Sequence, residues 1–287
     1  MSYKTIMVHM DTSARASARL ALALKLGRRF GAHLDGLFAA FEPRPREFYV
    51  MAGTADYYDT HRKLRREQRG AIERLFRAEL LRAQVDGAWV TAEGDPVTAV
   101  MQRSRSADLV IVGQTDRDDP ESYIAEHFTE TVLLGAGGPV LVVPYAGSFE
   151  SVGERVLVAW NGSREAARAV HDAMPFIARA AHVTIVAASA TASLSASTSI
   201  VPAERQASCA DLAAMLARHG ATKVEITRFD RDAAAATGDA LLSFAADGGY
   251  DLLVMGAYGH ARLQELVLGG ATRSILATMT LPVLMSH

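Results

Sequence analysis

Short apolar runs alternate with stretches of helical periodicity along the whole chain. The runs are rich in valine, isoleucine and leucine, as strands are when a parallel sheet is covered by helices on both faces. In the second half, the pattern predicts strands at 155–160, 182–189, 223–229, 251–256 and 282–286. It predicts helices at 163–180, 205–220, 238–249 and 263–279. Right-handed crossovers between such strands give a doubly wound α/β fold.

The chain consists of two copies of one unit. The segment from Asp108 aligns without a gap with the segment from Asp251, and upstream TIMVHMDTSARASARLAL matches RVLVAWNGSREAARAVHD. Residues 143 apart correspond: Asp108 and Asp251, Gly113 and Gly256, Thr129 and Thr272, Leu133 and Leu276, Pro139 and Pro282. The stretch 145–154 contains glycine and serine and has linker character. We therefore expect domains at 1–147 and 151–287, each with a doubly wound, five-stranded parallel sheet.

Composition removes several classes of function. The 287 residues are 49% hydrophobic and 22% charged, with a formal net charge of -2, so no overall field attracts nucleic acid or an anionic membrane. No apolar run approaches membrane-spanning length, and the N-terminus lacks a leader pattern. The single cysteine, Cys209, excludes an internal disulfide and is expected in or near a core. These features predict a cytoplasmic protein with neither nucleic acid nor membrane as partner.

The carboxyl edge of the second sheet is the expected ligand position, because ligands of doubly wound sheets lie where the winding reverses. Asn161 and Gly162 follow the first strand there, and Gly256 and Gly259 follow the fourth. The segment with Gly269, Gly270 and Thr272 would bring a second stretch of backbone and a hydroxyl. Backbone N–H groups at a helix start hold phosphate when glycines allow a close approach. The alternative is that these glycines serve only tight turns and helix packing.

Other phosphate and catalytic motifs are absent from the sequence. Neither G-x-x-x-x-G-K-[ST] nor G-x-G-x-x-G after the first strand occurs, which argues against P-loop hydrolysis and dinucleotide redox chemistry. The histidines lack zinc spacing, and no G-x-S-x-G elbow or paired catalytic carboxylates are recognisable. A metal site on protein side chains and hydrolase chemistry thus have no positive support.

The pattern G-x-x-G, nine residues, then a glycine pair and a closing PVL strand resembles the nucleotide motif of the universal stress protein family. The resemblance covers both halves and implies a tandem member with two Rossmann-like, adenine-nucleotide alpha hydrolase-like domains. It implies ATP as ligand, with Mg²⁺ or Mn²⁺ as the candidate metal, and a role in stress survival without established catalysis. The family's phosphate positions fall on Gly256, Gly259, Gly269 and Gly270, with Thr272 on a second hydroxyl position. Gly270 replaces the family's usual serine or threonine, which removes one hydroxyl.

The resemblance also implies a base side of the site. Asn161 stands where the family commonly has an aspartate bordering the adenine, and Gly162 follows it. Asparagine can accept through its carbonyl and donate through its amide, so adenine recognition is retained. Ala187 matches the position whose main chain touches the base in relatives.

The first copy departs from this pattern. Asp116, Glu126 and His127 replace three of the four glycines, and only Gly113 is kept. Each carboxylate would repel a phosphate by about 4 kcal/mol at ~4 Å in an effective dielectric of ~20. We expect no ATP in the first domain. The loop 115–122 carries four carboxylates, and a solvated acidic loop is favoured there over a metal site.

Three further expectations concern partners. The strands PVLVVP and PVLMS are candidates to pack the domains as an intramolecular pseudo-dimer, and a homodimer stays open. The aromatic loop 41–60 is either a lid or partner surface, or a loop packed on its own domain. The basic stretch 61–69 is interpreted as the solvent-exposed face of a helix. Glu73 and Arg77 are spaced to stabilise this helix as an ion pair. Its apolar stripe is made of Leu64, Ile72, Leu75, Phe76 and Leu80. A nucleotide-free scaffold for a hydrophobic ligand or protein, and a slow ATPase, are the alternatives to regulatory ATP binding.

Overall fold

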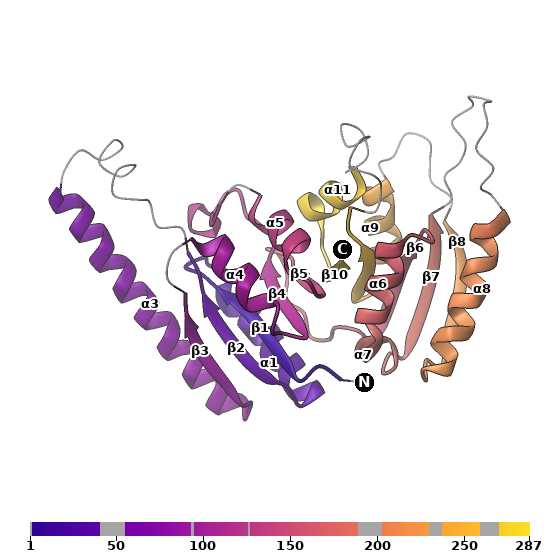
Figure 1. Cartoon of the computed structure of the whole chain (residues 1–287), viewed down its shortest axis with the longest axis horizontal. Coiled ribbons are helices and arrows are strands. Elements are labelled where there is room, and N and C mark those ends of the chain that lie inside the picture. Colours follow the sequence, from indigo (N-terminus) through magenta and orange to yellow (C-terminus); the bar gives the residue numbers. More distant parts are fainter. Residues whose placement is uncertain are drawn as a thin grey trace. The chain divides into compact units, whose positions relative to one another are not determined.

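The computed structural model describes residues 2–40, 55–92, 95–125, 127–188, 203–229, 237–258 and 270–287. It divides into two compact units, an N-terminal unit of Tyr3–Ala136 and a C-terminal unit built on Gly137–His287. Strands and helices alternate through both units (Figure 1). The predicted α/β class with parallel, doubly wound sheets is confirmed.

The N-terminal unit holds four parallel strands in the order β3-β2-β1-β4. Their bounds are β1 (Thr5–Met10), β2 (His33–Phe38), β3 (Gly87–Thr91) and β4 (Leu109–Gly113). The helices are α1 (Ala16–Phe30), α3 (Ala55–Ala83), α4 (Pro96–Ser104) and α5 (Phe128–Gly135), with a 3-10 turn, η1 (Pro120–Ser122). In the register of this sheet, Val8 of β1 lies opposite Gly36 of β2 and Ile111 of β4.

The C-terminal unit repeats this winding with strands in the order β10-β9-β6-β7-β8, all parallel. Their bounds are β6 (Arg155–Trp160), β7 (His182–Ala188), β8 (Val224–Phe229), β9 (Leu252–Gly256) and β10 (Val283–Ser286). The helices are α6 (Arg164–Asp172), α7 (Met174–Ile177), α8 (Ala203–Arg218), α9 (Thr237–Asp247) and α11 (Gly270–Thr278). The strands are therefore those that the apolar runs predict.

One further strand, β5 (Val140–Val143), belongs to the first repeat by sequence but lies in the C-terminal compact unit. It pairs antiparallel with β10, so that Val142 lies opposite Val283 and Val140 opposite Met285. All four residues of β5 are buried. The two strands PVLVVP and PVLMS, singled out from the sequence as packing edges, thus pair with each other.

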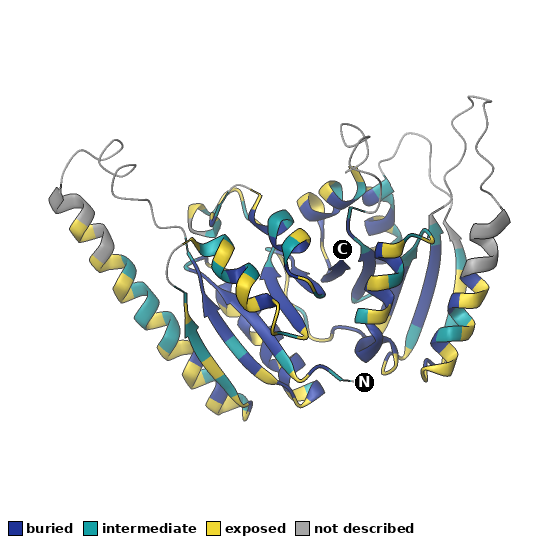
Figure 2. Cartoon of the chain, viewed as in Figure 1, coloured by how far each residue is buried: buried dark blue, intermediate teal, exposed yellow. Residues whose placement is uncertain are grey.

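The strands form the cores of both units (Figure 2). Side chains such as Ile6, Leu109, Leu157 and Val254 are completely buried, as expected for a sheet that helices cover. Cys209 on α8 is 4% exposed, which confirms the expectation that it is a core residue. Within the described ranges, no helix is long and apolar enough to cross a membrane.

An aspartate fastens each first strand to its sheet. Asp108 accepts hydrogen bonds from the backbone N–H groups of Lys4 and Thr5, at 2.7 and 2.9 Å. Asp251 accepts from the N–H groups of Gly153, Glu154 and Arg155 and from the Ser151 hydroxyl. The shared aspartate of the repeat therefore has a structural role before the fourth strand.

Two predictions about helices need correction. The helix predicted at 163–180 ends at Asp172, and α7 begins at Met174 with Pro175 in its first turn, because proline offers no N–H to continue the ladder. The apolar stripe predicted on α3 is narrower than expected: Phe76 and Leu80 are buried, whereas Leu64 and Leu75 are 51% and 38% exposed. The pair Glu73–Arg77 is confirmed, with 2.8 Å between Oε1 and Nη2.

Candidate functional site

Both units reverse their winding at one point of the sheet. In the N-terminal unit β1 lies between β2 and β4, and in the C-terminal unit β6 lies between β7 and β9. The crevice outside the carboxyl ends of the central pair of strands is the usual ligand position in such sheets. The two repeats thus supply two such positions, one at β1 and β4 and one at β6 and β9.

The turn after β6 is built by three consecutive residues. Asn161 accepts the Ser163 N–H on Oδ1 at 3.0 Å, and Gly162 has a φ of 72°, a left-handed conformation that favours glycine. Ser163 then caps α6, because its hydroxyl accepts the Ala166 N–H at 3.2 Å. The turn leaves Asn161 half-exposed at the edge of the sheet.

Ala187 lies beside this turn. In the register of β6 and β7 it is opposite Trp160, the residue before Asn161. The structure therefore brings Asn161, Gly162 and Ala187 to one edge, as the sequence predicts. Gly256 reaches the same edge at the end of β9, where it lies opposite Ser286 of β10.

Gly256 is explained by close packing. A Cβ at this position would lie 2.5 Å from the Ala166 nitrogen and 2.6 Å from the Glu165 carbonyl carbon. The start of α6 therefore approaches β9 more closely than any side chain would permit. The φ of Gly256 is not in the left-handed region, so for this glycine the packing interpretation is supported.

The second glycine segment is described only in part. Gly270 is the exposed first residue of α11, and a Cβ there would meet no atom within 4 Å. Thr272 is 6% exposed. Its counterpart Thr129 donates to the Gly113 carbonyl oxygen at 3.3 Å, which is a structural role. Gly259 and Gly269 lie outside the described residues, as do the segments 41–54 and 189–202.

Glu165 is a residue of this edge that sequence reasoning missed. It is 9% exposed, and its Cβ lies 2.8 Å from the position of a Cβ on Gly256. Burial raises the pKa of its carboxyl, but hydrogen bonds from its own N–H and Ser163, together with Arg164 and His287, outweigh burial and lower the pKa. The Glu165 carboxyl is therefore charged, in the helix turn whose backbone packs on Gly256. An acidic residue in the first turn of a helix was the available sequence signal.

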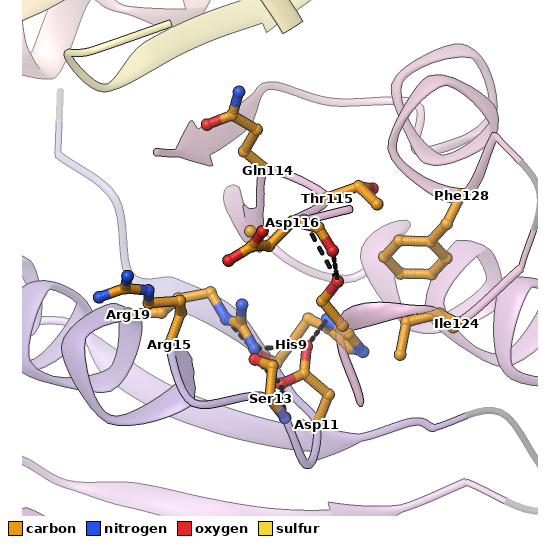
Figure 3. Close-up of a pocket in the computed structure, with 12 residues that line it drawn as sticks. His9, Asp11, Ser13, Arg15, Arg19, Gln114, Thr115, Asp116, Ile124 and Phe128 are labelled. Atoms are coloured by element: carbon orange, nitrogen blue, oxygen red, sulfur yellow. Dashed lines mark hydrogen bonds and ion pairs between the residues drawn. The ribbon is translucent and has the colours of Figure 1, made fainter. Parts of the chain in front are cut away.

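The crevice of the N-terminal unit holds a small pocket lined by 12 residues (Figure 3). The space left in it is about 10 Å³, close to the minimum that one water molecule needs. Residues after β1 and residues after β4 line it from two sides: His9, Asp11, Ser13, Arg15, Arg19, Gly113, Gln114, Thr115, Asp116, Ser122, Ile124 and Phe128. Sequence reasoning placed Gly113 and Asp116 here but missed Arg19.

A buried ion pair fills this crevice. Arg19 Nη2 lies 2.8 Å from Asp11 Oδ2, and Arg19 Nε donates to the His9 carbonyl oxygen at 2.7 Å. Both residues are 3% exposed. A Cβ on Gly113 would overlap Arg19 Nη1, so the guanidinium lies directly over the one glycine that this repeat keeps. We call Asp11 and Arg19 together the Arg19 plug.

The charges of this cluster follow from burial and from the pair itself. Burial raises the pKa of Asp11, but Arg19, His9 and the Ser13 hydrogen bonds more than offset it, so the pKa is lowered and the carboxylate is charged. Burial lowers the pKa of His9 to about 4, against a raising effect of Asp11. His9 is therefore neutral near pH 7, with Nε2 2.7 Å from the Ala39 carbonyl oxygen.

One residue of the acidic loop 115–122, Asp119, is hydrogen-bonded to the backbone before α1 and is not freely solvated. Asp119 Oδ2 accepts the Ala14 N–H at 3.0 Å, and the Ser122 hydroxyl bonds the Asp119 carbonyl oxygen at 2.8 Å. The Asp119 carboxylate thus accepts a hydrogen bond from the backbone just before α1. Among the described residues, no group of three histidine, cysteine or acidic side chains could hold a metal ion.

His127, the counterpart of Gly270, begins α5 with a φ of 54°. This left-handed conformation is uncommon for histidine. Glu126 lies outside the described residues. Of the predicted N-terminal substitutions, Asp116 lines the crevice and His127 stands at the helix start.

The fold defines a tandem, doubly wound α/β protein with one winding reversal in each repeat. The model of the universal stress protein family matches residues 2–144 and 153–287. The chain therefore belongs to the universal stress protein family, and it carries two copies of the family's domain.

Solved structures agree with this assignment of the fold. A universal stress protein from Archaeoglobus fulgidus DSM 4304 is 16% identical, with a TM-score of 0.70 over 98% of this chain and 95% of that one. Protein PA1789 from Pseudomonas aeruginosa PAO1, described as functionally unknown, is 14% identical with a TM-score of 0.55 over 99% and 92%. A universal stress protein of Synechocystis is 41% identical over 46 residues, which is 16% of this chain and only 16% of that protein.

Proposed function

We propose that the C-terminal unit binds an adenine nucleotide, ATP in the first place, and that binding serves a regulatory role in a stress response. The family membership supports the general role. The specific proposal depends on the carboxyl edge of the C-terminal sheet, where Asn161, Ala187 and Gly256 lie. Binding would change the surface that partners meet.

The observation that carries the proposal is the convergence of Asn161, Ala187 and Gly256 at the winding reversal. Asn161 uses Oδ1 to hold its turn, and its amide nitrogen can donate to a ring nitrogen of a base. Main-chain groups after β7 would supply the remaining polar contacts of the base. The glycine segment around Gly270 would receive the phosphates at the start of α11.

A divalent metal would enter with the nucleotide rather than with the protein. The described residues hold no three-ligand cluster, and Mg²⁺ commonly binds through phosphates and water with few protein ligands. Glu165 is a charged carboxylate in the first turn of α6, the helix whose backbone packs on Gly256, so a free triphosphate tail would meet repulsion at this helix start. Mg²⁺ or Mn²⁺ would reduce this repulsion. We therefore propose the metal complex of ATP as the ligand.

Tryptophan fluorescence offers a direct test. The chain has two tryptophans, and Trp160 precedes Asn161 at the C-terminal crevice, whereas Trp89 lies on β3 of the other unit. In a Trp89→Phe background, titration with ATP and Mg²⁺ should change Trp160 emission saturably. No saturable change, together with no heat in titration calorimetry, would contradict the proposal.

A matched pair of variants sharpens this test. Gly259→Asp gives the C-terminal unit the residue of the first repeat, and it should raise the ATP dissociation constant at least about tenfold. Thr222→Asp adds the same charge at an exposed position before β8, at the opposite end of that strand, and should change it little. Equal effects of the two variants would show that the glycine segment does not hold the phosphates.

Two other functions make different predictions for the ligand that the purified protein carries. Mass spectrometry of released ligands should detect ATP for regulatory binding, and ADP with magnesium-dependent turnover for a slow ATPase. A lipid or no ligand would favour a scaffold that uses the aromatic segment 41–60, of which the residues from Ala55 onward belong to α3 rather than to a loop. We also propose domains at 1–147 and 151–287 arranged as an intramolecular pseudo-dimer in a cytoplasmic protein, with the β5–β10 pairing as support. Sedimentation analysis would test whether a homodimer forms.

A further inference from the structure

We propose that Asp239 is a positioning residue of the nucleotide site, because it fixes helix α11, whose start would receive the phosphates. The inference rests on the proposed function and deepens it by naming a residue that acts on the ligand only through another element. α9 and α11 pack side by side (Figure 1). Each of them precedes a strand of the parallel sheet, so each begins at the carboxyl edge.

The first turns of the two helices approach each other closely at Gly238. A Cβ at this position would lie 2.8 Å from the Ala271 carbonyl oxygen and 3.0 Å from the Ser274 Cβ. Gly238 and Ile275, which faces it, are both buried. A side chain on Gly238 would therefore push the first turn of α11 away from α9.

Asp239 bonds α11 from the position next to this contact. Its Oδ1 accepts the hydroxyl of Ser274 and, at 3.2 Å, the hydroxyl of Thr278. The Thr278 hydroxyl also lies 2.9 Å from the Ser274 carbonyl oxygen, so its proton is shared between two acceptors. One carboxylate oxygen thus links the start of α9 to two successive turns of α11. The contact at Gly238 sets the distance between the helices, and these hydrogen bonds set the position of α11 along its axis.

The first repeat uses the corresponding aspartate differently. Asp95 caps its own helix, because its Oδ2 accepts the Thr98 N–H at 2.8 Å and the Thr98 hydroxyl at 2.7 Å. The counterpart of Thr278 is Gly135, where a Cβ would overlap the Met101 sulfur. The first repeat therefore has an apolar contact where the second has the Thr278 hydrogen bond.

Titration calorimetry of Asp239→Ala and Asp239→Asn, with ATP and Mg²⁺ and with adenosine, tests the positioning role. Alanine removes the acceptor, whereas the asparagine amide oxygen keeps it. We expect Asp239→Ala to raise the ATP dissociation constant about fivefold and to leave that of adenosine, which has no phosphates, unchanged. Asp239→Asn should keep the wild-type affinity for both ligands. Equal losses for both ligands, or tighter ATP binding by both variants, would overturn the proposal.

A double-mutant cycle assigns the effect to the hydrogen bonds with α11. The variant Ser274→Ala, Thr278→Val removes both donors, and it should weaken ATP binding as much as Asp239→Ala does. Adding Asp239→Ala to it should cause little further loss, because the changes break the same bonds. Additive losses would show that Asp239 acts through another contact and would overturn the assigned role.

Asp95→Ala is the matched control, since it removes the aspartate from the same place in the first repeat. It should leave the dissociation constants of ATP and adenosine unchanged. Hydrogen exchange of the ligand-free protein checks the link itself. Asp239→Ala should speed the exchange of the amides at 275–278, and Asp95→Ala should not. Unchanged exchange of these amides in Asp239→Ala would contradict the proposal.

Failure of this inference is distinguishable from failure of the proposed function. A wild-type protein that binds no ATP contradicts the proposed function and, with it, a positioning role in that site. A wild-type protein that binds ATP, together with an Asp239→Ala variant that binds it equally, contradicts the positioning role alone.

Discussion

The two repeats share one topology but differ in what lies over the glycine that ends the fourth strand. Over Gly113, the N-terminal unit places the guanidinium of Arg19, which is paired with Asp11. Over Gly256, the C-terminal unit places the backbone of α6 at Glu165 and Ala166. The same strand-end glycine thus accommodates a side chain in one repeat and a helix start in the other. The comparison shows that a retained motif glycine does not by itself mark a retained ligand site.

The largest effect is expected from breaking the plug on one side only. Arg19→Ala leaves the buried carboxylate of Asp11 without its partner, which should lower the free energy of unfolding by about 3–5 kcal/mol. Asp11→Asn, Arg19→Ala removes both charges and should cost clearly less. Urea unfolding of both variants measures the difference. Arg77→Ala, which breaks an exposed pair, is the control and should cost less than about 1 kcal/mol.

Acid should weaken the N-terminal unit selectively through His9. Burial lowers its pKa in the folded protein to about 4 from the ordinary value of 6.5, so unfolding takes up a proton between these values. Stability is therefore complete above pH 6.5 and falls as the pH drops toward 4, by up to about 3 kcal/mol. Urea unfolding at several pH values tests this. His9→Gln should flatten the dependence in this window, and an unchanged slope would exclude His9 as its source.

Gly256 should tolerate no side chain. Gly256→Ala puts Cβ against the backbone of α6, 2.5 Å from the Ala166 nitrogen, and should lower the free energy of unfolding by about 1–3 kcal/mol. Gly270→Ala is the matched control, because its Cβ meets nothing within 4 Å at an exposed helix position. That change should be neutral or stabilise by up to about 1 kcal/mol. Thermal melts should therefore show a lower melting temperature for Gly256→Ala and an unchanged or slightly higher one for Gly270→Ala.

Gly270→Ser gives the smallest expected effect. It restores the hydroxyl that the family motif usually carries, and the open space at Gly270 admits it. One additional hydrogen bond to a phosphate would strengthen ATP binding by about 1 kcal/mol, or roughly fivefold. Titration calorimetry against wild type and Gly270→Ala measures this gain. Identical affinities of the serine and alanine variants would place the phosphates away from this helix start.

The strands and the repeat were predictable because they depend on local composition. Runs such as 155–160 contain valine and leucine at every buried position, and β6 has these bounds. The spacing of Asp108 and Asp251 also carried real information, since both fasten a first strand. The break before Pro175 was visible in principle, because proline interrupts helices. The helical periodicity on both sides of Pro175 nevertheless favours one continuous helix.

The content of the crevices was less predictable. Glycine spacing places Gly256 at the sheet edge but does not reveal that α6 packs on it. The pair of Asp11 and Arg19 depends on where α1 lies over β1 and β4, which is a tertiary property. Comparing the repeats position by position would have exposed the joint change to Asn161 and Ala169. The glycine motif indicates only the turn after the fourth strand and the start of the last helix.

The central claim is that one repeat binds ATP and the other does not. Native mass spectrometry of the intact chain, titrated with ATP and Mg²⁺, measures this directly as the number of nucleotides per chain. We expect saturation at one nucleotide, and we expect Gly259→Asp to raise the ATP concentration that saturation requires at least about tenfold. A chain that takes up two nucleotides, or none, would contradict the account.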